Sequence, residues 1–195
     1  MSLTTVPLDT PAGITAKLGW DPGTSVHDRR RILAKELIAE QLGCETSDIV
    51  IVREEPRGFG YHTRLIASKD GEALPIAIAT ASFRAATVVA VCDPGLPVGV
   101  DIRDHEPEPA ELHRMRKHSH LFDEADVPDL LRHWTRVQAV LEADGRGVRV
   151  APDHVRLDAT RRKGWLPDRK MQYSLVDASR DGWVITIASG VLPRG

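Results

Sequence analysis

Asp101 and Arg103 lie two positions apart in segment 98–103, which reads VGVDIR. In a strand, alternate side chains share a face, so this carboxylate and guanidinium would lie side by side while Val100 and Ile102 point into packing. Asp101 could then act as a base or hydrogen-bond acceptor, and Arg103 could donate to a carbonyl oxygen that gains charge in a transition state. The alternative is an ion pair with a purely structural role.

A second segment, 134–147, reads WTRVQAVLEADGRG and lies in a predicted helix. We predict this helix over about 127–143, because apolar residues recur at helical spacing and Gly145 follows as a stop. Trp134 lies on the apolar stripe, where it is either a core residue or a platform for a substrate. Gln138 lies next to the stripe, and its amide would either bridge structural groups or orient a substrate.

The elements that must position these residues occur twice along the chain. A Thr-, Pro- and Gly-rich stretch over 1–25 predicts an irregular lead-in. A helix is then predicted over about 27–42, followed by strands near 49–52, 64–68, 74–81 and 87–92. After the helix over 127–143, the second half repeats the plan with strands near 154–157, 171–176 and 183–188, so that 87–91 corresponds to 183–187.

This repeat predicts an α+β fold made of two similar halves, 1–97 and 98–195, each a helix with an antiparallel sheet. We expect the halves to be related by pseudo-twofold symmetry and to pack face to face as one compact unit. A ligand would then bind in the cleft between them.

The two segments and the duplicated plan resemble the 4'-phosphopantetheinyl transferases of the larger, single-chain type. That family carries motifs that read roughly G-[VI]-D-[IV]-E and W-x-x-K-E-[AS]-x-x-K-x-x-G-x-G. The residues retained here are Gly99, Asp101, Trp134, Gly145 and Gly147. The resemblance covers most of the chain from about residue 27 onward. It implies a pseudo-dimeric α+β fold and, in the ordinary family member, transfer of phosphopantetheine from coenzyme A to a carrier-protein serine with magnesium.

The positions that hold magnesium in the family are changed in this sequence. Arg103 stands where the family has a second carboxylate, and Gln138 stands where it has the glutamate that completes the metal site and helps to activate the acceptor serine. Magnesium needs hard, usually anionic oxygen ligands, and a fixed guanidinium competes with the metal for Asp101. We therefore expect no bound metal.

The positions that contact phosphate and nucleotide in the family are changed as well. Val137 and Glu142 replace two lysines, and Glu142 would repel a phosphate. Thr80, in the pair Ala79-Thr80, aligns with a Ser-His pair that contacts the nucleotide. Thr80, Trp134, Val137 and Glu142 are therefore candidate substrate-binding residues of a less charged site, and we expect no cofactor.

Composition excludes several other classes of protein. The 195 residues include 26 Lys and Arg against 28 Asp and Glu, so there is no global basic excess for nucleic acid. No apolar run approaches a membrane span, and the first ten residues lack the features of a signal peptide. Two cysteines do not imply a disulfide framework, so we expect a cytoplasmic protein. The segment KHSH at 117–120 lacks a third assignable ligand, which favours a polar surface over a metal site.

These observations leave three functional hypotheses. The first is a repurposed tailoring enzyme of bacterial specialised metabolism, a monomer that cyclises or isomerises an apolar polyketide- or peptide-derived intermediate, free or bound to a carrier protein. Asp101, Arg103 and Gln138 would be its catalytic residues. The second is a genuine 4'-phosphopantetheinyl transferase with an unusual metal site. The third is a non-catalytic protein that binds a carrier protein or its phosphopantetheine arm, with Arg103 meeting the phosphate.

Overall fold

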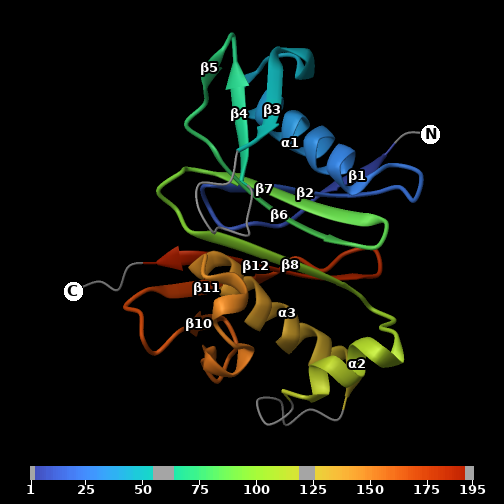
Figure 1. Cartoon of the computed structure of the whole chain (residues 1–195), viewed down its shortest axis with the longest axis vertical. Coiled ribbons are helices and arrows are strands. Elements are labelled where there is room, and N and C mark those ends of the chain that lie inside the picture. Colours follow the sequence, from blue (N-terminus) through green and yellow to red (C-terminus); the bar gives the residue numbers. More distant parts are fainter. Residues whose placement is uncertain (1–2, 55–63, 119–125, 192–195) are drawn as a thin grey trace. The chain divides into compact units, whose positions relative to one another are not determined.

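A computed structural model describes residues 3–54, 64–118 and 126–191 (Figure 1). The fold is α+β, with helices packed on antiparallel sheets. The chain divides into two compact units, Met1–Leu96 and Pro97–Gly195.

Unit 1 contains a four-stranded sheet, a three-stranded sheet and one long helix. The four-stranded sheet has the order β1-β2-β7-β6, and the three-stranded sheet has the order β3-β4-β5. Helix α1 packs against both sheets through a shared apolar cluster. The elements are β1 (Thr4–Pro7), β2 (Ile14–Trp20), α1 (Val26–Leu42), the 3-10 helix η1 (Thr46–Asp48), β3 (Ile49–Arg53), β4 (Leu65–Lys69), β5 (Glu72–Ala73), β6 (Ala77–Phe83) and β7 (Ala86–Cys92).

The irregular lead-in predicted for residues 1–25 is wrong, because β1 and β2 lie within it. Ile14, Ala16 and Leu18 alternate with other residues along β2 and are buried. Lys17, on the opposite face, forms ion pairs with Glu36 and Glu40 of α1. Its Nζ lies 3.3 Å from Glu36 Oε2. The alternation specifies a strand, but the surrounding Thr, Pro and Gly residues obscured it.

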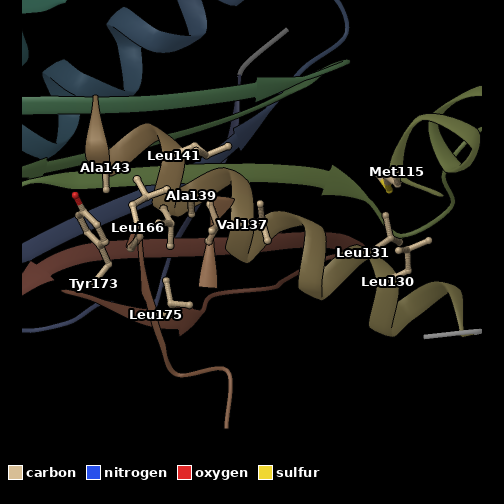
Figure 2. Packing of buried hydrophobic residues seen from close by; sticks show 13 residues of the cluster. Met115, Leu130, Leu131, Val137, Ala139, Leu141, Ala143, Leu166, Tyr173 and Leu175 are labelled. Carbon is tan, nitrogen blue, oxygen red and sulfur yellow. The ribbon is translucent and has the colours of Figure 1, made fainter. Parts of the chain in front are cut away.

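Unit 2 contains a single five-stranded antiparallel sheet with the order β8-β12-β11-β10-β9. Helix α3 packs on one face of this sheet, and its apolar side chains form the core with those of β11, β12 and the neighbouring loops (Figure 2). The elements are β8 (Val98–Asp104), α2 (Pro109–Arg116), α3 (Val127–Asp144), the 3-10 helices η3 (Gly147–Arg149) and η4 (Pro152–His154), β9 (Arg156–Leu157), β10 (Lys163–Trp165), β11 (Gln172–Asp177) and β12 (Trp183–Val191).

Sequence patterns locate the main elements of both units but miss the short ones. The α1 and α3 predictions agree with the structure to within one residue at each end. The turn at Asp181-Gly182 joins β11 to β12, and both residues have positive φ, 52° and 81°. Helix α2 and strand β10 were not predicted, because eight and three residues are too short for a clear period. Among the described residues, no helix is long and apolar enough to cross a membrane.

Candidate functional site

Strand β8 presents Gly99, Asp101 and Arg103 to helix α3. A Cβ atom built at Gly99 would lie 2.1 Å from the Ala139 carbonyl oxygen and 2.3 Å from the Ala143 nitrogen, so the helix backbone lies directly on this residue. Because alternate residues of a strand share a face, Asp101 and Arg103 point to the same side. Val100 and Ile102 point to the opposite face, where they are buried.

A pair of threonines ties α3 to the sheet next to Asp101. Thr186 of β12 is the cross-strand partner of Asp101 and therefore also faces the helix. Its hydroxyl lies 2.9 Å from the hydroxyl of Thr135, and both side chains are buried. Because Thr135 donates its own proton to the carbonyl of Arg132 at 3.0 Å, Thr186 must be the donor between the two hydroxyls. This bond holds the Thr135 turn of α3 against the strand next to Asp101.

The Asp101 carboxyl is buried, with only 8% of the residue exposed. Arg103 Nη2 donates to its Oδ1 at 3.1 Å. Its Oδ2 is buried and has no hydrogen-bond partner among the described residues. The pKa of Asp101 is raised to about 7, mainly because the group is buried; the Arg103 charge lowers this pKa and the Glu142 charge raises it. A carboxyl group with this pKa exchanges protons near neutral pH.

Three side chains of α3 form a row along the helix surface at intervals of four residues: Trp134, Gln138 and Glu142. Glu142 is exposed, yet its charge acts on Asp101, which places this end of the row near β8. Gln138 is half-buried, one turn from each of the other two. The predicted catalytic pair Asp101 and Arg103 is therefore in contact, and Gln138 lies on the adjoining row of the helix.

Val137, expected among the substrate-binding residues, lies in the core of unit 2. Its side chain is 1% exposed and belongs to the core cluster shown in Figure 2. Val137 therefore packs in the core of unit 2. Its role as a substrate-binding residue stays a prediction. The valine follows the apolar stripe of the helix, and alignment with a family lysine was a weaker guide than that stripe. Trp134 is half-buried and packs against the same cluster.

The glycines after α3 have a structural explanation. Gly145 caps the helix with φ of 78°, and Gly147 has φ of 55°. These are left-handed conformations that favour glycine. Between the two glycines, Arg146 Nη2 donates to Asp168 Oδ1 at 3.0 Å, and its Nε donates to Asp144 at 2.5 Å. The Gly-Arg-Gly turn therefore clamps the end of α3 to the loop before β11.

Thr80 lies on β6 of unit 1, half-buried, with Val89 of β7 as its cross-strand partner. Val89 packs against α1, so Thr80 shares the α1 side of that sheet. The expectation that Thr80 joins Asp101 in one cleft stays a prediction.

The residues near Asp101 do not fit a magnesium ion. Asp101 is already bonded to a guanidinium. Among the described residues, no group of three or more carboxylate, cysteine or histidine side chains is arranged to hold a metal ion. Magnesium requires several oxygen ligands in near-octahedral geometry. In the KHSH segment, His118 bonds to Asp153 at 2.7 Å, while Ser119 and His120 lie outside the described residues.

Sequence reasoning missed Thr135, Thr186 and the partner of His118. Thr135 lies one helical turn before Ala139, on the same face of α3. A threonine on the face with the small apolar residues was the available signal for a buried polar contact. Asp153 carried no signal, because its contact with His118 spans thirty-five positions of sequence.

No known family matches this chain, and no curated protein matches it.

Proposed function

We propose that the protein is a cofactor-free acid–base enzyme that isomerises or cyclises an uncharged organic substrate, with Asp101 as its proton-transfer group. The observation that carries this proposal is the Asp101 carboxyl, buried, with a pKa of about 7 and an Oδ2 atom that has no partner among the described residues. A general acid or base works best when its pKa lies near the working pH. An ordinary structural aspartate has a pKa near 3.9 and is bonded through both oxygens.

The neighbours of Asp101 supply the other requirements of such a reaction. Arg103 is held against Oδ1 and has a side chain that is 24% exposed, so it can turn from the carboxylate to a substrate carbonyl. Gln138, on the adjoining row of α3, can donate its amide to the same oxygen. Because Oδ2 is buried, a neighbouring side chain must move aside before a substrate can reach it.

The topology of each unit supports a duplicated origin for this scaffold. In unit 1, strand β2 is followed by α1 and by a hairpin, β6–β7, whose second strand pairs antiparallel with β2. In unit 2, strand β8 is followed by α3 and by a hairpin, β11–β12, whose second strand pairs antiparallel with β8. The common order supports the proposal of a phosphopantetheinyl-transferase-like architecture. A substrate derived from a polyketide or peptide is proposed from the resemblance of the motifs to that family.

The proposal is tested with 5-nitrobenzisoxazole, a neutral planar probe for a protein base. A base removes its ring C–H proton, the N–O bond breaks, and the electrons of that bond remain on a coloured phenolate. We expect the rate to rise with pH through about 7 and Asp101→Asn to reduce it at least about ten-fold, the lower end of a general-base contribution.

Glu106→Gln, on an exposed side chain, is the control and should keep the wild-type rate. Equal rates in Asp101→Asn and the wild type, or no acceleration over buffer, would contradict the proposal.

The transferase alternative is tested separately. Apo carrier protein is incubated with the chain, coenzyme A and magnesium, and its intact mass is measured. We expect no added phosphopantetheine and no magnesium-dependent binding of coenzyme A by calorimetry, because the site offers a guanidinium where the metal needs a ligand. A carrier protein that gains the phosphopantetheine mass would establish the transferase.

A further inference from the structure

Glu142 of α3 and Arg103 of β8 approach Asp101 from opposite ends of the strand. The turn of α3 that holds Glu142 lies on Gly99, because a Cβ atom built at Gly99 would be 2.3 Å from the nitrogen and 3.0 Å from the Cα atom of Ala143. Gly99 stands two positions before Asp101 on β8, and Arg103 stands two positions after it. Because alternate residues of a strand share a face, all three follow one another along the side of β8 that meets α3.

The direction of the helix brings the Glu142 carboxylate toward Asp101. Thr135 contacts Thr186, the cross-strand partner of Asp101, so the Thr135 turn lies at the level of Asp101. Glu142 follows Thr135 by seven residues, which is almost two full turns, and therefore lies on the same face of α3. Helical side chains lean toward the N-terminus of their helix, and in α3 this is the direction from Gly99 to Asp101. We therefore expect the Glu142 side chain to lean along β8 toward the Asp101 carboxyl.

The electrostatics of Asp101 agree with this geometry. Two side-chain charges act on its pKa: that of Arg103 lowers it, and that of Glu142 raises it. Arg103 Nη2 lies 3.1 Å from Asp101 Oδ1. Glu142 is exposed and forms no ion pair with another residue of 3–54, 64–118 and 126–191, so no neighbouring cation in these ranges cancels its charge. A substrate at Asp101 would meet a positive charge at one end and a negative charge at the other.

We propose that Arg103 and Glu142 orient the substrate, which carries a carbonyl group toward Arg103, a nitrogen-bound hydrogen toward Glu142 and an acidic C–H group between them. This inference rests on the proposed acid–base function and deepens it by naming the substrate class, an amino or amido carbonyl compound. Asp101 removes the proton of the C–H group, and the electrons of that bond move into the carbonyl, whose oxygen gains charge beside Arg103. The Glu142 carboxylate accepts the N–H bond. Return of the proton to another atom of the same electron system completes an isomerisation, so the step needs no oxidant or cofactor.

The position of Glu142 has a readout that does not depend on activity. Removal of its charge in Glu142→Gln should lower the pKa of Asp101 below about 7, measured by carbon-13 NMR of the carboxyl group. Glu106→Gln, which removes an exposed carboxylate beside His105, is the control and should leave this pKa unchanged. An unchanged pKa of Asp101 in Glu142→Gln would refute the inference, because Glu142 would then lie too far away to orient a substrate at Asp101.

The orienting role is tested with three benzisoxazoles that differ in the charge of one substituent: the neutral 5-nitro compound, a trimethylammonium analogue and a carboxylate analogue. With a pKa of about 7 or below, Asp101 is ionised at pH 9 in both the wild type and Glu142→Gln, so the comparison reports on substrate charge. We expect Glu142→Gln to lower kcat/KM about three-fold for the cationic analogue and to raise it about three-fold for the anionic one, the size of a Coulomb interaction between unit charges a few ångströms apart in water. The change should lie in KM, because the charge acts on binding. Glu142→Asp, which keeps the charge, should keep the wild-type preference.

These measurements separate failure of this inference from failure of the proposed function. If Asp101→Asn loses cleavage of the neutral probe while Glu142→Gln treats all three probes as the wild type does, the orienting role of Glu142 is wrong and the acid–base function stands. If Asp101→Asn cleaves the neutral probe at the wild-type rate, the proposed function and this inference both fail. A wild-type protein whose KM is lower for the anionic analogue than for the cationic one would also overturn the inference.

Discussion

Gly99 of β8 lies so close to Ala139 of α3 that a side chain at position 99 would meet the helix carbonyl at 2.1 Å. This contact sets how near the helix comes to the strand that carries Asp101. It also explains why the residue before Val100 is a glycine, without any reference to a bound ligand. The same helix row continues to Ala143, whose nitrogen would be 2.3 Å from that side chain.

Gly99→Ala should therefore destabilise unit 2. The clashing atoms belong to the helix backbone and cannot turn aside, so the expected loss in the free energy of unfolding is about 3 kcal/mol, the upper range for overpacking. Chemical denaturation followed by circular dichroism measures it. Gly95→Ala is the control, because a Cβ atom there meets only the Asp93 carboxylate, at 3.4 Å. A Gly99→Ala protein as stable as the wild type would mean that α3 does not pack this closely.

The raised pKa of Asp101 should make the stability of the protein depend on pH. The folded-state pKa of about 7 exceeds the ordinary value of 3.8, so the folded chain binds the extra proton between these limits. The stabilising contribution of this group is fully present below about pH 4 and is lost as pH rises through about 7. Comparing unfolding free energies at pH 5 and pH 8, we expect the wild type to lose more stability than Asp101→Asn. Equal losses would show that Asp101 is an ordinary surface-like carboxylate.

Arg103 should hold the pKa of Asp101 below the value that burial alone would give. Burial is the largest cause of the shift, and the guanidinium is the main effect that opposes it. In Arg103→Gln we therefore expect the pKa of Asp101 to rise above about 7, measured by carbon-13 NMR of the carboxyl group. Arg132→Gln, which removes an exposed guanidinium paired with Asp129, is the matched control and should leave that pKa unchanged. A lower pKa in Arg103→Gln would refute the ion-pair assignment.

The sequence by itself determined helices α1 and α3, most strands and the nearness of Asp101 to Arg103. Helical periodicity of apolar residues specifies α1 and α3, and the two-residue period of a strand places a carboxylate and a guanidinium on one face. Both signals depend only on neighbours along the chain. The same reasoning failed at β1 and β2, where short alternation lies among Thr, Pro and Gly residues.

Tertiary structure alone decided what surrounds these groups. The burial that raises the pKa of Asp101 exists only in the folded chain, and the bond between His118 and Asp153 joins segments separated by a whole helix. The place of Val137 in the core cluster is also a property of the folded chain. Burial, desolvation and long-range hydrogen bonds depend on which distant segments pack together, and no local pattern of residues encodes that choice.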